Sequence, residues 1–166
     1  MTSPTSESAA TPPVVITPEG FLDHWQGHRR VTRRIIDAFP EDKLFDFSVG
    51  GMRSFATLAQ EFIGMAVPTL RGVITGTWEQ FSEAPKPATK AELLQVWDDT
   101  TAEIDRLWPE IPAARFQETD LAFGQWQMPM YGLLLYVVDN EIHHRGQGYV
   151  YLRALGIEPP PFYDRS

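Results

Sequence analysis

The sequence contains no cysteine among its 166 residues. This absence excludes disulfide bonds, thiolate metal ligands and a cysteine nucleophile, and it fits the reducing cytoplasm, where we expect the protein. Basic residues are also few, since 14 Lys and Arg stand against 22 Asp and Glu and give a net charge of -8. Nucleic-acid binding needs a cationic surface, so we expect no nucleic-acid partner.

Long apolar runs are missing as well. The most apolar stretch, residues 130–138, is much shorter than the ~20 residues that cross a bilayer. Residues 1–16 are rich in Ser, Thr, Pro and Ala and lack the basic start and apolar core of a signal peptide. We therefore expect no membrane contact, a flexible N-terminal tail over residues 1–16, and a single domain over residues 17–166.

Four segments have the apolar spacing of long amphipathic helices. The first begins at Thr17-Pro18-Glu19 and ends before Pro40, and the second begins near Ser54, with Pro68 predicted to kink it or to end its regular hydrogen-bond ladder. The third begins with a capping box at residues 89–92 and ends before Pro109. The fourth runs from Pro129 to Gly156, where the following prolines prevent continuation.

The connections determine how these helices can be ordered. Residues 40–53 are predicted to be a loop, and residues 109–128 an irregular segment with short strands near 116–119 and 122–127. Residues 74–88 form a connection long enough to return the chain along a 20-residue helix, at ~3.3 Å per residue. Helices two and three can then run parallel, so we predict an all-α, up-down-down-up four-helix bundle with a long crossover between them.

The fourth helix has two stripes of buried character. One contains Asn140 and His144 at i and i+4, a spacing at which two side chains can share a metal. The other contains Val138, Arg145 and Tyr149 among apolar residues. A helix with two apolar faces is buried on both. We therefore expect a homodimer that pairs through the second stripe.

The end of this helix reads His143-His144-Arg145-Gly146-Gln147, followed by GYVYLRALGIEPPP. This pattern resembles the last helix of the DinB family, the DinB/YfiT-like bundles, in which the motif is His-x-x-x-His-Arg-Gly-Gln. The resemblance extends from about Trp25 to Tyr163. It implies a dimeric four-helix bundle with a divalent metal on three histidines, which activates the thiol of a low-molecular-weight cofactor for transfer reactions in stress or detoxification.

Only one of the three family ligands is a histidine here. His144 matches the second histidine of the motif, Asn140 replaces the first, and Glu61 falls at the position of the third, on the second helix. From periodicity alone, Glu61 is either a ligand or a solvated residue at the edge of its helix. A carboxylate, an amide and an imidazole can still bind a divalent metal, for which Zn or Ni is favoured over Fe or Mn.

The helix rise of 1.5 Å per residue places four of the candidate side chains in one layer of the bundle: His28, Glu61, Asn140 and His144. His28 is either a hydrogen-bonded core residue or part of a pocket. Gln147 and Tyr151 share the stripe of His144, and we expect His143 to support the site or an interface. Arg145 needs a partner if it is buried, as an anchor for a loop or a second subunit, and Gly146 would allow close helix approach.

Two functions follow from these residues. The first is a divalent-metal-dependent transferase that acts with an external low-molecular-weight thiol. The second is a non-catalytic dimer with a degenerate metal site, which binds a small ligand or acts structurally. Without metal, Glu61 and His144 would form a hydrogen-bonded pair in a pocket, with His144 as an acid or base, or a polar network that only stabilises the bundle.

Overall fold

The computed structural model describes residues 14–79 and 86–166, and this part of the protein is mostly helical, as predicted. Four long helices account for most of it: α1 (Pro18–Ala38), α3 (Phe55–Thr75), α4 (Lys90–Leu107) and α5 (Met130–Ala154). The smaller elements are α2 (Glu41–Asp46), the 3₁₀ turns η1 (Trp108–Glu110) and η2 (Ala113–Phe116), and the strands β1 (Thr119–Ala122) and β2 (Trp126–Pro129).

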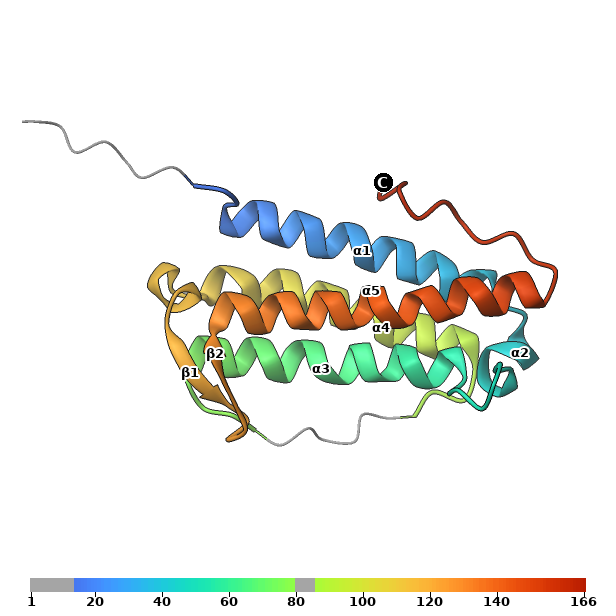
Figure 1. Ribbon diagram of the computed structural model, residues 1–166, viewed down its shortest axis with the longest axis horizontal. Coiled ribbons are helices and arrows are strands. Elements are labelled where there is room, and N and C mark those ends of the chain that lie inside the picture. The colour runs from blue at the N-terminus through green and yellow to red at the C-terminus, as the bar shows by residue number, and fades with distance from the viewer. Residues whose placement is uncertain (1–13, 80–85) are drawn as a thin grey trace, which may run out of the picture.

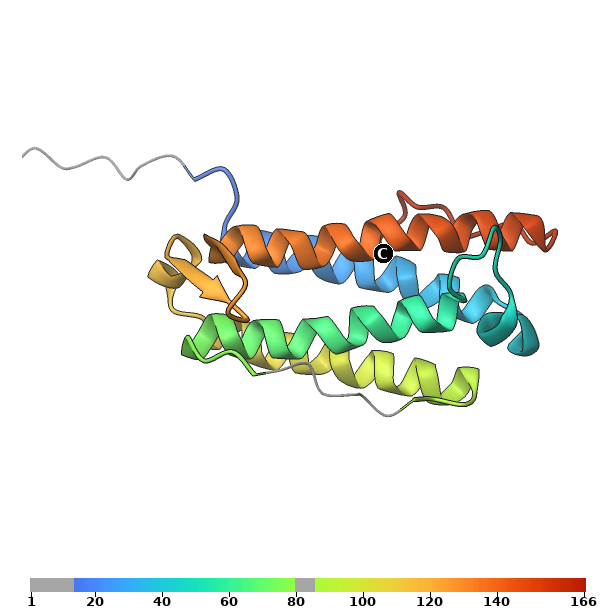
Figure 2. The ribbon, with the colours of Figure 1, turned by 60° about the horizontal axis from the view of Figure 1, so that its bottom comes forward.

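The long helices lie side by side along one axis (Figure 1). In Figure 2, α1 and α5 form one layer and α3 and α4 the other. Each helix packs against two others along its length, so that α5 contacts α1 and α3, and α4 contacts the same two helices. The colour gradient shows that α1 and α5 run in one direction and α3 and α4 in the opposite one (Figure 1).

The helices begin where the capping residues predict. The Thr17 hydroxyl accepts the Gly20 amide at 3.0 Å, and Ser54 accepts from Thr57 at the start of α3. At α4, Thr89 and Glu92 form the reciprocal capping box. These contacts satisfy amides that a helix leaves without internal partners, which is why the sequence locates these three starts well.

Two local predictions differ from the structure, and one alternative for Pro68 is excluded. The segment predicted as a loop contains the short helix α2, and the strands lie at 119–122 and 126–129, a few residues later than expected. Pro68 does not end the second predicted helix, because α3 continues through it to Thr75. The predicted tail and the long crossover lie partly outside the described residues.

A layer of polar side chains divides the buried core along the bundle. On one side is an apolar cluster around Trp25, Trp108 and Met130, and on the other a cluster around Phe39, Phe55 and Trp97. Between them lie the buried polar side chains of α1 and α5: His28, Arg29, Thr32, Glu141 and Arg145. Among the described residues, no helix is both long and apolar enough to cross a membrane.

Candidate functional site

The structure brings Glu61, Asn140 and His144 together between α3 and α5. The Asn140 amide Nδ2 donates to Glu61 Oε1 at 3.1 Å, and His144 Nε2 lies 3.7 Å from the same oxygen. The carboxylate comes from the middle of α3, and the other two side chains come from successive turns of α5. The sequence therefore identified three residues that meet although 79 positions separate Glu61 from Asn140.

Arg53 is a fourth member of this cluster. Its guanidinium donates to Glu61 Oε2, and its backbone carbonyl accepts the Tyr151 hydroxyl at 3.0 Å. Tyr151, predicted to be near the site, is fully buried and so fixes the segment that carries Arg53. Arg53 precedes the N-cap of α3, and nothing in its local sequence signals that it folds over the following helix.

Two neighbours fix the orientation of His144. The Gln147 amide Nε2 donates to His144 Nδ1 at 2.8 Å, so Nδ1 is the acceptor and the proton lies on Nε2, facing Glu61. The Phe62 ring stacks on the imidazole, with 6.2 Å between centroids. Burial lowers the pKa of His144, although Glu61 acts in the opposite direction. His144 is therefore a neutral hydrogen-bond donor at pH 7.

The charge of Glu61 is also set by its neighbours. Burial acts to raise the pKa of Glu61, but hydrogen bonds from Arg53 and Asn140 outweigh it, and the pKa lies below its ordinary value. Hydrogen bonds and cations that favour the ionised form have this effect on a carboxyl group. Glu61 is therefore an ionised acceptor beside a neutral imidazole donor.

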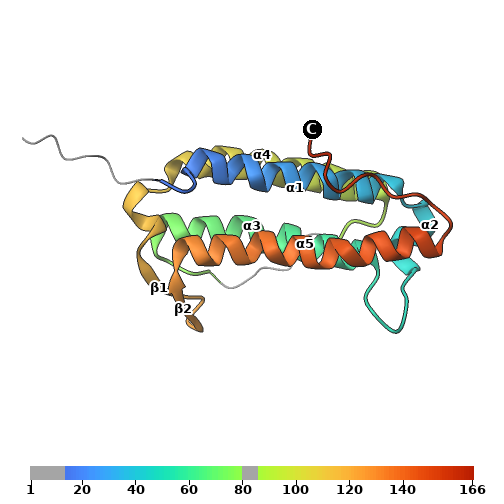
Figure 3. The same ribbon diagram turned by 45° about the horizontal axis from the view of Figure 1, so that its top comes forward.

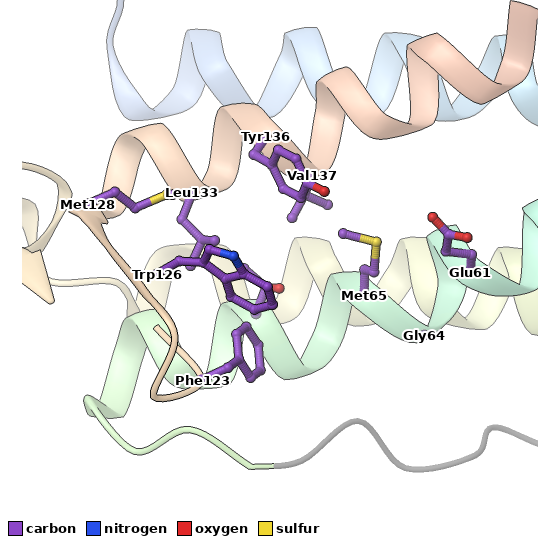
Figure 4. Close-up of a pocket in the computed structure, with 10 residues that line it drawn as sticks. Glu61, Gly64, Met65, Phe123, Trp126, Met128, Leu133, Tyr136 and Val137 are labelled. Carbon is purple, nitrogen blue, oxygen red and sulfur yellow. The ribbon is translucent and has the colours of Figure 1, made fainter. Parts of the chain in front are cut away.

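A pocket of about 430 Å³ opens beside this cluster, between α3, α5 and the β1–β2 hairpin. Glu61 lies at one end of it, and Phe123, Trp126 and Met128 lie at the other (Figure 4). Leu133 and Val137 of α5 and Met65 of α3 form apolar walls between the two ends. The site is thus an apolar pocket with a carboxylate at one end.

The donor set does not fit a divalent cation. Among residues 14–79 and 86–166, no three His, Asp or Glu side chains are grouped closely enough to hold a metal ion. Asn140 directs its amide nitrogen at Glu61, and His144 directs a protonated nitrogen at the same carboxylate. The Arg53 guanidinium already provides a positive charge there. A metal would have to displace all three contacts, and the metal and thiol cofactors stay predictions.

A second polar group lies on the other side of α5 and contains residues adjacent to those of the first. Glu141 Oε1 accepts the Thr32 hydroxyl at 2.5 Å, and Glu141 Oε2 lies 4.0 Å from Arg29 Nη1. Arg145 donates from Nη1 to the His28 carbonyl at 3.0 Å and from Nη2 to the His28 ring at 2.9 Å. All five side chains are at least 96% buried, so this group is sealed from solvent.

This sealed group decides between the two interpretations of His28 and corrects the prediction for Arg145. His28 shares the predicted layer with Glu61 but faces α5 from the opposite side, where burial first and Arg145 second lower its pKa to about 3. Arg145 is an anchor, as predicted, but it binds helix α1 rather than a loop or a second subunit. Of its two alternatives, His28 is thus the hydrogen-bonded core residue, and it does not line the Glu61 pocket.

One further motif residue, Gly146, differs from expectation. A Cβ at Gly146 would meet nothing within 4 Å, so Gly146 does not mediate a close helix approach. Gly148 has that role, because a Cβ there would lie 2.5 Å from the Phe55 ring. His143 is exposed, and its ring lies edge-on to that of His144, with 4.8 Å between centroids, so its predicted role at the site or an interface stays a prediction.

The second stripe of α5 does not form an open face. Leu134, Val138 and Leu152 are fully buried within the single chain. Its apolar character is explained by packing inside the bundle, so it is no evidence for a subunit interface. Homodimer formation stays a prediction that rests on the family resemblance alone.

Fold and site together define a class: a helical bundle with a polar cluster and an apolar pocket between two of its long helices. A model of the DinB family matches residues 14–166, and the chain belongs to that family. Two crystal structures of DinB-like proteins resemble it. The Bacillus cereus protein is 20% identical, with a TM-score of 0.71 over 87% of this chain and 97% of its own.

The Bacillus subtilis protein is 19% identical, with a TM-score of 0.68 over 87% of this chain and 96% of its own. Identities this low establish the shared fold and nothing about ligands. A search of curated proteins found no match.

Proposed function

We propose that this protein binds a small, largely apolar molecule in the pocket between α3, α5 and the β1–β2 hairpin, and holds the polar end of that molecule at Glu61. The observation that carries this proposal is the apolar pocket that ends on a carboxylate. Its volume of about 430 Å³ lies within the ~300–1,000 Å³ range of small-molecule sites. Such sites combine apolar walls with a few fixed polar groups.

The polar cluster suits the recognition of a hydroxyl group, which can donate to Glu61 and accept from His144. Glu61 offers an ionised acceptor, and His144 offers a neutral N–H donor, each held by a second contact from Arg53 or Gln147. A ligand group that pairs with both would avoid leaving either one desolvated and unpaired, which gives specificity beyond the apolar contacts. The same arrangement disfavours a bound cation, so we derive no reaction step through a metal or a metal-bound thiol.

Occupancy of this pocket can be tested with a neutral apolar fluorophore, N-phenyl-1-naphthylamine. Its emission should rise on binding to the wild-type protein and saturate at one probe per chain. Gly64→Leu should abolish the signal, because Gly64 lines the pocket and a Cβ there meets no other atom within 4 Å. The matched control is Gly132→Leu, a helical glycine with equally open surroundings that does not line the pocket.

Saturable binding that Gly64→Leu removes and Gly132→Leu retains would support the proposal. No saturable signal with wild type, or the same loss in both variants, would contradict it. Circular dichroism of each variant would establish that the helices are intact. A second titration, with Glu61→Gln and a hydroxylated naphthalene, should show weaker binding of the hydroxylated probe and unchanged binding of the apolar one.

A further inference from the structure

The end of the pocket opposite Glu61 is formed by aromatic side chains. The β1–β2 hairpin lies at the end of the bundle, beside the start of α5 (Figure 3), and its Phe123 and Trp126 line the pocket (Figure 4). Their ring centroids are 6.2 Å apart, with 75° between the planes, an edge-to-face arrangement that aromatic pairs favour. Tyr136 of α5 adds a third ring to the lining. The two ends of the pocket therefore differ in chemistry, with a carboxylate at one and aromatic rings at the other.

The rings of this wall have surface that a ligand can reach. Trp126 is 46% exposed and Tyr136 is 55% exposed, whereas Trp25, Trp97 and Trp108 are buried in the core. Removing apolar surface from water is favourable, so a ligand that covers a half-exposed indole gains binding free energy from it. Trp126 is therefore available for binding, while those three tryptophans already contribute to packing.

The backbone at Phe123 is unusual for its residue type. Its φ is 52°, and among the described residues it is the one non-glycine with a positive φ. That conformation suits Gly, Asn and Asp, which are the usual residues at such turn positions, so a phenylalanine there costs conformational energy. Contact with the Trp78 ring, at 4.9 Å between centroids, offsets part of this cost. A strained residue in the wall of a pocket favours a functional reason for its side chain.

The hairpin is anchored to α3 by several contacts. Arg115 Nε donates to the Val73 carbonyl at 2.8 Å, and the same guanidinium pairs with Asp120 of β1. The Trp78 ring lies directly on Gly72 of α3, where a Cβ would be 2.2 Å from it. A wall that is held in place before binding loses little conformational freedom on binding, which favours affinity.

We infer that the ligand of this pocket is an alcohol that carries an aromatic ring at its far end, with the hydroxyl at Glu61 and the ring against Phe123 and Trp126. The inference rests on the function proposed above and adds the class of ligand. Aromatic pairs contribute free energy beyond the area that they bury, so an aromatic ring should bind here more tightly than a saturated one. The lining residues of α3 extend from Glu61 to Thr69, or ~12 Å along the helix, which accommodates two six-membered rings in line.

The test compares two alcohols that differ only in the far ring, trans-4-phenylcyclohexanol and trans-4-cyclohexylcyclohexanol. Both have the same hydroxyl group, and the saturated compound has the larger apolar surface, so apolar burial alone would favour it. We expect calorimetric titration of the full-length wild-type protein to show about three- to tenfold tighter binding of the phenyl compound.

Two hairpin variants should each reduce this preference to about twofold or less. Trp126→Leu keeps an apolar side chain at a half-exposed position, and Phe123→Asn supplies a residue that accepts the positive φ. The matched control is Tyr131→Leu, because Tyr131 is 42% exposed and does not line the pocket. Its preference should equal that of the wild type, and circular dichroism would establish that all three variants are folded.

A preference for the phenyl compound that both hairpin variants reduce and Tyr131→Leu retains would support the inference. Equal affinities in the wild type, a preference that the hairpin variants leave unchanged, or an equal loss in Tyr131→Leu would overturn it and leave the proposed function in place. Absence of saturable binding by both alcohols, or binding that Gly64→Leu leaves intact, would overturn the proposed function and this inference together. Glu61→Gln should weaken both alcohols by the same factor, because the hydroxyl is common to them.

Discussion

The two polar groups on α5 are made from adjacent residues and differ in almost every physical respect. Asn140 and His144 face α3 and a pocket, with His144 18% exposed and its partner Glu61 28% exposed. Glu141 and Arg145 face α1 and are almost completely buried. A turn of ~100° per residue is enough to separate them. The comparison shows that one short motif can provide both a sealed structural network and an accessible site.

The difference in burial between the two polar groups should appear in the free energy of unfolding of their variants. In a sealed network, removal of one charge leaves its partners desolvated and unpaired, which costs far more than the loss of an exposed ion pair. In the accessible cluster, water can replace a lost contact.

Glu141→Gln should destabilise the protein by roughly 3–5 kcal/mol, because Arg29 and Arg145 would remain buried with no carboxylate between them. Glu61→Gln makes the same chemical change in the accessible cluster and should cost about 1 kcal/mol or less. Urea unfolding followed by circular dichroism measures both. Similar costs for the two variants would show that the network is not sealed as described.

The sealed group should dominate the pH dependence of the protein's stability. His28 has a pKa of about 3 when folded and an ordinary value of 6.5 when unfolded, so the unfolded chain binds the extra proton between these values. Stability is therefore full above the unfolded pKa and falls as the pH is lowered towards about 3, by roughly 2–3 kcal/mol between pH 7 and pH 4.

His28→Asn keeps an acceptor for Arg145 but cannot titrate, so its stability should change less over this range. The difference between the two proteins at each pH isolates His28 from Glu141, whose pKa burial raises against the effect of Arg29. His24→Asn is the comparison variant, because His24 lies one turn earlier on the same helix and is only partly buried, with its ring 4.6 Å from that of His28. Parallel curves for wild type and His28→Asn would contradict the prediction.

Packing of the motif glycines gives a third comparison. Gly148→Ala should destabilise by about 1–3 kcal/mol, because its Cβ would overlap the Phe55 ring. Gly146→Ala has open space and should stabilise the helix by up to about 1 kcal/mol. Thermal unfolding of both proteins measures the difference, and the opposite order would mean that the contacts of these two positions have been misassigned.

The smallest predicted change concerns metal. Wild-type protein incubated with Zn, Ni and Mn and then desalted should retain well under one metal per chain by elemental analysis, because the donor set is already paired. Glu61→His together with Asn140→His would provide three imidazoles in this place and should bind Zn at least about tenfold more tightly, or about 1.4 kcal/mol. Stoichiometric wild-type metal that His144→Ala removes would restore the metal-dependent transferase hypothesis.

The sequence determined much of this molecule by local rules. Capping by Thr17, Ser54 and Thr89 located three helix starts, and the absence of a continuous apolar run matched the finding that no described helix could span a membrane. The motif around His144 identified the family. Helix rise placed Glu61, Asn140 and His144 at one height because distance along a helix depends only on residue count.

Tertiary structure decided which side of the bundle each residue occupies. Rotation of one helix against its neighbours is set by packing of the whole core, so nothing local separated His28 from Glu61, or showed that the second stripe of α5 is buried within one chain. The same applies to Arg53, which contacts Glu61 while its backbone carbonyl accepts the hydroxyl of Tyr151, 98 residues away. The pocket forms between elements distant in sequence, and only the folded chain contains it.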